Sequence, residues 1–211
     1  IIALGFLTAL VYAYFNAKRF GLNLDRLLDV VLVAAPVAIL SARLYYIIFY
    51  TGNLKINSIG DFFGFSGKSG ISGLAIYGGV IGTALCGFLM CKIKKVNILD
   101  AFDLAASGFF IGQAVGRWGN FFNQEAYGSY INSDFWGMTN QFLDGNVHPC
   151  FLYESVWCVL GFVLLHFLGN KRKFKGQLCL TYGMWYGFGR MIIEGLRTDS
   201  LYIGPLKVSQ W

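Results

Sequence analysis

The chain is poor in charged residues. Only 13% of its 211 residues are Asp, Glu, Lys or Arg, whereas 56% are hydrophobic and 18% are aromatic. Ordinary soluble domains carry roughly 25% charged residues. The composition therefore excludes a typical soluble domain and indicates a membrane protein.

Cysteine and histidine are scarce as well, with five and two residues. An odd number of cysteines at irregular spacing provides neither a disulfide framework nor the spacing of a metal site. Cys86, Cys91, Cys158 and Cys179 lie in or beside apolar segments, where we expect small buried side chains. No metal or nucleotide motif is present, so we expect no cofactor.

The few charges are unbalanced, with a formal net charge of +6. Such a charge could indicate a nucleic-acid partner. Here, however, the basic residues form short clusters between apolar segments, as the topology of a membrane protein requires. We therefore expect membrane lipid, and no nucleic acid, as a partner.

Apolar segments make up most of the chain. Six of them are candidate transmembrane helices. Five are residues 1–15, 27–50, 71–91, 151–168 and 176–193, and the sixth begins at residue 98 and runs into the polar stretch that starts at residue 112. A helix needs about 20 apolar residues to span a bilayer. Residues 1–15 fall short of this length and begin without Met. We predict an all-α polytopic protein in which 1–211 form a single integral membrane domain, truncated at both ends.

The basic residues between these segments predict the orientation. Alternating loops place nine of them on one side: Lys18, Arg19, Lys92, Lys94, Lys95, Lys171, Arg172, Lys173 and Lys175. The two complete loops on the other side contain only Lys55 and Lys68. The positive-inside rule assigns the nine to the cytoplasm, so loops 51–70 and 123–149 should face outward.

Residues 112–128, GQAVGRWGNFFNQEAYG, combine a helix end with many polar side chains. If the helix continues, Gln113, Arg117 and Asn120 lie on one face. An arginine with neighbouring amides can bind a phosphate, because the guanidinium group grips two oxygens at once. The alternative is a snorkelling arginine in a helix-terminal cap. Three glycines spaced by four also favour close approach of a neighbouring helix: Gly108, Gly112 and Gly116.

Other charges lie in or at the rim of apolar segments, namely Arg43, Arg190 and Glu194. An arginine at the centre of a membrane helix costs about 2.5–3.5 kcal/mol on insertion scales. Such residues must therefore lie at the rim, pair with carboxylates or line a wet cavity. Arg190 and Glu194 are spaced for a pair within one helix, and Glu125 and Glu154 are further partners.

Four of the residues named so far lie toward the predicted outer ends of their helices: Arg43, Arg117, Arg190 and Tyr77. We therefore expect them to converge on one outward-opening polar cavity.

The string GRWGNFFNQEAYG resembles the signature of the prolipoprotein diacylglyceryl transferase family. The matching positions are Gly116, Arg117, Asn120, Asn123, Glu125 and Gly128. Four further strings are similar to motifs of the same family: SARLYYIIF (41–49), GLAIYGGVIG (73–82), HPCFLYE (148–154) and GRMIIEGLR (189–197). One departure is Tyr77, which stands where many members carry His.

The resemblance implies a bacterial cytoplasmic-membrane enzyme with seven helices and an active site toward the outer side. Its reaction would transfer the diacylglyceryl group of phosphatidylglycerol to the lipobox cysteine of a prolipoprotein signal peptide, releasing glycerol phosphate. We expect Arg117 and Arg190 to hold the phosphate, and Tyr77 to transfer a proton or position the phosphate. Glu125 or Glu194 would bind headgroup hydroxyls or hold an arginine. The remaining substrate-binding candidates are Asn120, Asn123, Arg43, Gly78, Gly79 and His148.

Two other functions deserve comparison. Residues 64–67 read GFSG, which could mark Ser66 of an intramembrane serine protease, but GxSG arises easily among 27 glycines. A transporter or channel for an anionic solute would also use membrane arginines. It would need a polar path through the inner halves of the helices, which are apolar apart from Asp29, Asp100 and Asp103.

Overall fold

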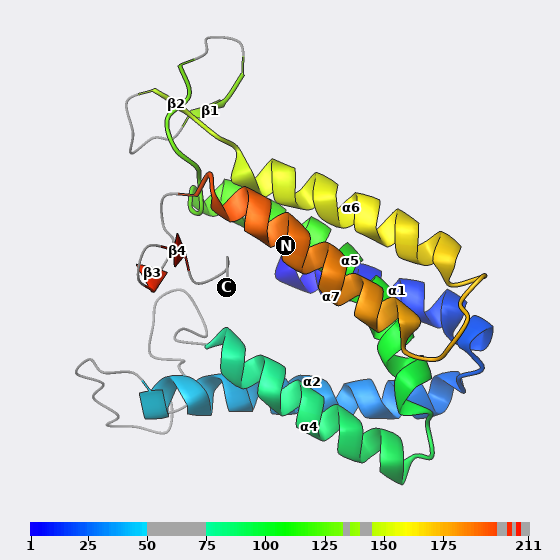
Figure 1. The fold of residues 1–211 in the computed structure, drawn as a ribbon. Coiled ribbons are helices and arrows are strands. Elements are labelled where there is room, and N and C mark those ends of the chain that lie inside the picture. Colours follow the sequence, from blue (N-terminus) through cyan, green and yellow to red (C-terminus); the bar gives the residue numbers. More distant parts are fainter. Residues whose placement is uncertain (50–74, 133–135, 140–144, 198–201, 204–205, 208–211) are drawn as a thin grey trace. The chain divides into compact units, whose positions relative to one another are not determined.

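The computed structural model describes residues 1–49, 75–132, 136–139, 145–197, 202–203 and 206–207. Its helices are α1 (Ile2–Asn16), η1 (Ala17–Phe20), α2 (Leu24–Phe49), α4 (Ile76–Ile93), α5 (Ile98–Asn123), α6 (Cys150–Leu168) and α7 (Gln177–Glu194) (Figure 1). The strand pairs are β1 (Met138–Thr139) with β2 (Asn146–Val147), and β3 (Tyr202–Ile203) with β4 (Leu206–Lys207). The predicted loop 51–70, with Ser66, lies outside the described residues.

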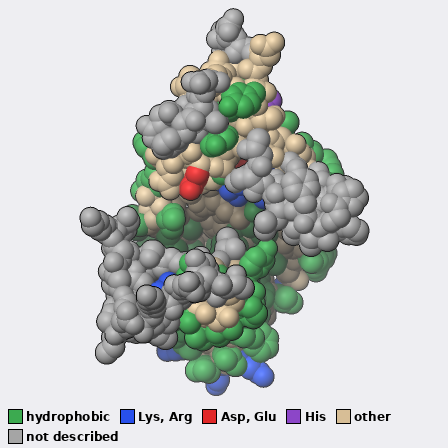
Figure 2. Space-filling view, turned by 90° about the vertical axis from the view of Figure 1, so that its left-hand side faces the viewer, with side chains coloured by type: hydrophobic (Ala, Val, Ile, Leu, Met, Phe, Trp, Pro, Cys, Tyr) green, Lys and Arg blue, Asp and Glu red, His purple; other side chains and the backbone are tan. Residues whose placement is uncertain are grey.

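A helix lies within each segment that the sequence predicts to be transmembrane, over the residues that are described. Within the described residues, α2, α5 and α6 are long and apolar enough to cross a membrane, and Tyr77–Ile93 forms a shorter apolar helix. Large apolar side chains are exposed on the helices, for example Leu32 on α2 at 70% and Met184 on α7 at 77%. Hydrophobic side chains accordingly cover much of the described surface in Figure 2. The chain is therefore a helical membrane protein, while the count of six spans stays a prediction.

The chain folds as two compact units. Unit 1 contains residues 1–20 and 102–211, and unit 2 contains residues 21–101. The single integral membrane domain over 1–211 stays a prediction.

Unit 2 is a pair of helices, α2 and α4, in close contact. The backbone N–H of Ala75 donates to the carbonyl of Ala42 at 3.1 Å. A Cβ atom on Gly78 would lie 3.0 Å from the Cα atom of Ala42, so the glycine permits this approach. At the far end, Lys94 Nζ pairs with Asp29 Oδ2 at 2.6 Å. Asp29 therefore belongs to a partly exposed ion pair.

In unit 1, α1 packs on α5 through small residues. A Cβ atom on Gly5 would lie 2.8 Å from the carbonyl oxygen of Gly112, and one on Gly108 would lie 3.5 Å from the Cβ atom of Ala9. The predicted close approach is thus confirmed at Gly108 and Gly112. A Cβ atom on Gly116 would have no neighbour within 4 Å among the described residues, so the third glycine is not part of this contact.

Helices α6 and α7 are joined by a pair of tryptophans. The indole N–H of Trp157 donates to the carbonyl of Trp185 at 3.0 Å, and the indole N–H of Trp185 donates to the carbonyl of Trp157 at 3.0 Å. The two rings stack with centroids 4.6 Å apart. Satisfied indole donors and stacked rings make a strong contact in a membrane, where unpaired polar groups are costly.

The segment that follows α5 is anchored to the ends of both α6 and α7. The N–H of Gly128 donates to the carbonyl of His148 at 2.9 Å, and the N–H of Ser129 donates to the carbonyl of Leu196 at 2.9 Å. Gly128 also forms a β-bridge with Arg197. The predicted outer connection therefore has ordered backbone pairing in its described part.

Candidate functional site

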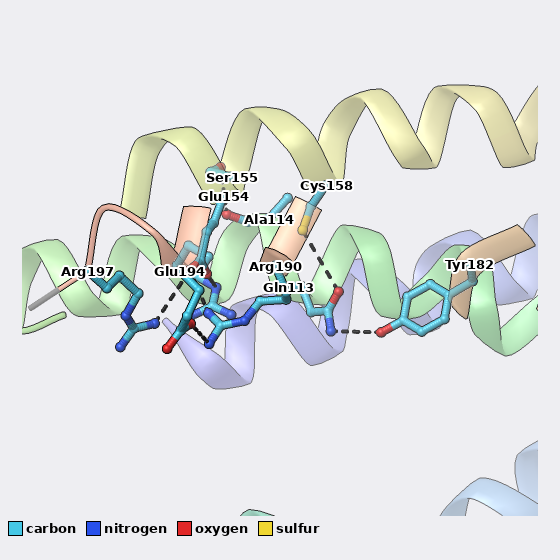
Figure 3. Close-up of polar contacts among 10 residues, drawn as sticks. Gln113, Ala114, Glu154, Ser155, Cys158, Tyr182, Arg190, Glu194 and Arg197 are labelled. Carbon is cyan, nitrogen blue, oxygen red and sulfur yellow. Dashed lines mark hydrogen bonds and ion pairs between the residues drawn. The ribbon is translucent and has the colours of Figure 1, made fainter. Parts of the chain in front are cut away.

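Helix α5 runs without a break to Asn123. The signature residues up to Asn123 are therefore helical, and Gln113, Arg117 and Asn120 share one face, as predicted. Gln113 Nε2 donates to the hydroxyl oxygen of Tyr182 on α7 at 2.8 Å, and the thiol of Cys158 on α6 contacts Gln113 Oε1 at 3.8 Å. This polar face of α5 thus points between α6 and α7 (Figure 3).

One carboxylate organises the end of this face. Glu154, in the first turns of α6, is 4% exposed. Its Oε2 pairs with Arg117 Nε at 2.5 Å, and its Oε1 accepts hydrogen bonds from Arg190 Nη1 at 2.7 Å and Arg197 Nη1 at 3.4 Å. Three arginines from α5, α7 and the segment after α7 therefore meet on one buried acid. Figure 3 shows Arg190 and Arg197 beside Glu154.

A second buried carboxylate completes the group. Glu194 is 5% exposed, and its Oε2 accepts a hydrogen bond from Arg190 Nη2 within helix α7. The predicted pair of Arg190 and Glu194 is confirmed. The guanidinium group of Arg190 therefore bridges two carboxylates and has a fixed orientation. We refer to Arg117, Arg190, Arg197, Glu154 and Glu194 as the arginine–glutamate cluster.

The charges of the cluster do not cancel. Three guanidinium groups against two carboxylates leave a formal charge of +1. The contact with Glu154 is made by Nε of Arg117, at one edge of the planar guanidinium group. Paired Nη donors in one plane match two oxygens of a phosphate or carboxylate. An anion bound at the Nη donors of Arg117 would suit the positive formal charge of the cluster.

Sequence reasoning did not identify two members of this cluster as site residues. From the sequence, Glu154 is expected only as a possible counterion, and nothing distinguishes Arg197 within the string 189–197. Both lie in the quoted motifs HPCFLYE and GRMIIEGLR, at the positions that end them. The sequence signal for both residues is a charged side chain at the edge of an apolar segment, where charges are costly and often functional.

The other predicted residues of the signature lie at the end of α5. The amide of Asn123 donates to Glu125 Oε1 at 3.1 Å, and both side chains are exposed. Glu125 lies between Gln124 and Ala126, whose φ angles are +55° and +56°. Left-handed backbone is uncommon for residues other than glycine and often marks a functional turn. This turn holds Glu125 and Asn123 together, and their pair is separate from the buried ion pairs of Glu154.

His148 lies beside the same turn, because its backbone pairs with Gly128. Its Nδ1 is 3.2 Å from the hydroxyl oxygen of Tyr153, which also accepts a hydrogen bond from the indole N–H of Trp136 at 2.9 Å. Tyr153 precedes Glu154 in α6. The predicted site residue His148 is thus tied to the helical turn that carries the cluster.

Four predicted site residues belong to unit 2. Arg43 is 6% exposed, with its Cζ atom 5.5 Å from the ring centroid of Tyr46. Tyr77 is 65% exposed, whereas Gly78 and Gly79 pack against α2. The convergence of Arg43 and Tyr77 with Arg117 and Arg190 stays a prediction.

Two cavities adjoin the helices of the cluster. An open groove of about 360 Å³ is lined by Ile1, Leu4, Ala114, Val115, Trp118, Phe122, Ser155 and Val159. A second cavity of only about 10 Å³ lies against Glu154, Trp157, Cys158, Tyr186, Arg190 and Ile193. The first is apolar and the second is nearly filled, so the outward polar cavity stays a prediction. In the part of the chain that the structure describes, no group of three or more His, Cys, Asp or Glu side chains is placed to hold a metal ion.

Known proteins are similar in sequence to this chain over its whole length. The sequence model of a family described as prolipoprotein diacylglyceryl transferase matches residues 1–211. A phosphatidylglycerol–prolipoprotein diacylglyceryl transferase of Streptococcus sanguinis is 44% identical over 220 residues, covering 100% of this chain and 82% of the relative. Relatives with the same name from Clostridium novyi and Clostridioides difficile are 39% and 41% identical, with the same coverage.

Proposed function

The chain belongs to the prolipoprotein diacylglyceryl transferase family, and we propose that it transfers the diacylglyceryl group of phosphatidylglycerol to the lipobox cysteine of a prolipoprotein. The sulfur of the cysteine attacks the glyceryl carbon that carries the phosphate ester. A C–S thioether bond forms, the C–O bond breaks, and its electron pair leaves with glycerol phosphate. The thiol proton passes to a base. This reaction is the first step of bacterial lipoprotein maturation.

The observation that carries this proposal is the gathering of three arginines on Glu154. The phosphodiester of phosphatidylglycerol has one negative charge, which the formal charge of +1 on the cluster balances. A released phosphate monoester carries about −1.5 to −2 charges at neutral pH. Negative charge therefore grows on the phosphate during the reaction, and fixed guanidinium donors stabilise this change more than they stabilise the bound lipid.

Within the cluster, the arginines have different roles. Glu154 binds Nε of Arg117 and so directs the paired Nη donors of Arg117 toward the phosphate. Arg190 holds both carboxylates in place and adds positive charge at the same point. Arg197 adds a third guanidinium group from the segment that pairs with Gly128. Arg117 is therefore the principal phosphate ligand in this proposal.

The turn after α5 supplies the remaining contacts to the headgroup. Asn120, Asn123 and Glu125 offer amide and carboxylate groups that suit the hydroxyls of glycerol. His148 is held beside this turn by its backbone bonds and by Tyr153. We assign these residues to the orientation of the headgroup. Arg43 and Tyr77 are assigned to the same reaction from the family motifs, with Tyr77 transferring the thiol proton or donating to the phosphate.

We place the protein in the bacterial cytoplasmic membrane, with the active site toward the outer side. Nine basic residues in one set of loops against two in the other support this orientation. The partners are then phosphatidylglycerol and a prolipoprotein that still carries its signal peptide.

The described residues of the chain offer no specific support for a transport function. The buried carboxylate of Asp103 accepts hydrogen bonds from Arg172, Gly176 and Cys179. It thereby caps α7 and neutralises an arginine instead of lining a path for an anion.

The proposal is tested by supplying the protein, in lipid nanodiscs, with headgroup-labelled phosphatidylglycerol and a lipobox peptide. A matched peptide with serine in place of cysteine is the control. We expect glycerol phosphate to be released only with the cysteine peptide, which gains one diacylglyceryl group by mass. Release without the peptide, or no modification of the peptide, would contradict the proposal.

A further inference from the structure

A second charged region lies at the end of unit 1 away from Glu154, where η1 meets the connection between α6 and α7 (Figure 1). It contains six basic residues: Lys18, Arg19, Lys171, Arg172, Lys173 and Lys175. We refer to these residues as the basic turn. The chain has no Asp or Glu in residues 1–20 or in residues 155–193. These two stretches of sequence therefore bring no acidic residue to the basic turn, and Arg172 finds its carboxylate in Asp103 of α5.

The two arginines of the basic turn hold it in a fixed shape. Arg172 Nη1 donates to Asp103 Oδ2 at 3.0 Å, and Asp103 is fully buried. Arg19 Nη2 donates to the carbonyl oxygen of His166 at the end of α6. Between them lies the buried ring of Phe20, 5.8 Å from Arg19 Cζ and 5.0 Å from Arg172 Cζ. The arginines thus serve the fold, and they fix the backbone that carries the lysines.

The lysines of this turn point to solvent next to apolar side chains. Lys18, Lys171 and Lys173 are exposed. Phe15 and Phe174 are exposed by 75% and 54%. Ammonium groups beside exposed aromatic rings are typical of a surface that lies at the boundary between lipid tails and headgroups.

We propose that the basic turn binds the headgroup phosphates of anionic phospholipids and stabilises unit 1 through this contact. Clusters of four to eight Lys or Arg residues next to a membrane helix attract anionic lipid headgroups. Here the lysines stand on a turn that Asp103 and Phe20 already order, so little conformational freedom is lost on binding. This lipid site is separate from the arginine–glutamate cluster and does not depend on the transferase activity.

The experiment measures thermal melting of the helical signal in nanodiscs of phosphatidylcholine, with and without phosphatidylserine. Phosphatidylserine is the anionic probe because it lacks the glycerol headgroup of the proposed substrate. For the native sequence, we expect phosphatidylserine to raise the melting temperature by about 4–8 °C. The variant Lys171→Gln/Lys173→Gln should lose at least half of this rise, while its melting temperature in phosphatidylcholine alone should change little.

A matched control removes two lysines elsewhere. Lys92 and Lys95 are exposed at the end of α4 in unit 2, so Lys92→Gln/Lys95→Gln should keep most of the rise. The proposal is overturned if phosphatidylserine does not stabilise the native sequence, or if Lys171→Gln/Lys173→Gln responds as the native sequence does. An equal loss in the control variant would also overturn it, because the effect would then follow from net charge alone.

Discussion

Replacing Glu154 with glutamine tests whether this carboxylate organises the site. Glu154→Gln keeps the size of the side chain and removes its charge. Glu194 would then be the one carboxylate left in the cluster, and the formal charge of the cluster would rise from +1 to +2. Removing one partner of a buried ion pair costs about 3–5 kcal/mol. The side chains of Arg117 and Arg190 are 20% and 21% exposed, so we expect the lower end, about 3 kcal/mol.

This loss corresponds to a fall in melting temperature of about 6–12 °C for a chain of this size. Transfer should fall by at least about 10²-fold, because Arg117 loses the contact that directs its paired donors. Both quantities are measured on the purified variant in lipid nanodiscs, with transfer expressed per folded protein. The control is Asp29→Asn, the same chemical change in an ion pair whose acid is 49% exposed, which should cost less than about 1 kcal/mol. Normal melting and normal transfer by Glu154→Gln would refute the reasoning.

Three further predictions concern the turn after α5, the other unit and the orientation. Gly128→Ala should lower the melting temperature by several degrees, because its Cβ atom would lie 2.6 Å from the Cβ atom of His148; an unchanged melting curve would contradict this packing. Tyr77→Phe should depress transfer strongly and alter its pH profile if the hydroxyl transfers the proton, whereas near-normal turnover would remove that role. For orientation, engineered cysteines are needed because Cys91 and Cys150 are buried. An impermeant thiol reagent added to cells stripped of any outer barrier should label the exposed Ser129→Cys before Lys92→Cys, and the reverse order would invert the topology.

The contacts that sequence could predict are the local ones. Arg190 and Glu194 are one helical turn apart, so their pairing follows from helix geometry. The close approach at Gly108 and Gly112 follows in the same way from residue size. The burial expected for four cysteines is confirmed at Cys91 and Cys158, whereas Cys86 and Cys179 are only partly buried.

The central contact of the site is not local. Glu154 on α6 meets Arg117 on α5 and Arg190 on α7. No periodicity in the sequence specifies which of these helices become neighbours. Asp103 shows the same limit. The sequence shows only that it lies near the start of its own helix, whereas in the fold it caps α7 and pairs with Arg172. Charges in apolar segments reveal that partners must exist, and only the fold shows which partners they are.

The central claim is that Arg117 holds the phosphate of the lipid with two donors that Glu154 directs. The most direct test is the transfer rate of Arg117→Lys per folded protein, with folding followed separately by thermal melting. A lysine would place its single ammonium group near Glu154 and could not also present a planar pair of donors. We expect a loss of at least about 10²–10³-fold with little change in melting temperature. The matched change Arg26→Lys, at an exposed arginine of α2, should have no effect. Near-normal transfer by Arg117→Lys would contradict the claim.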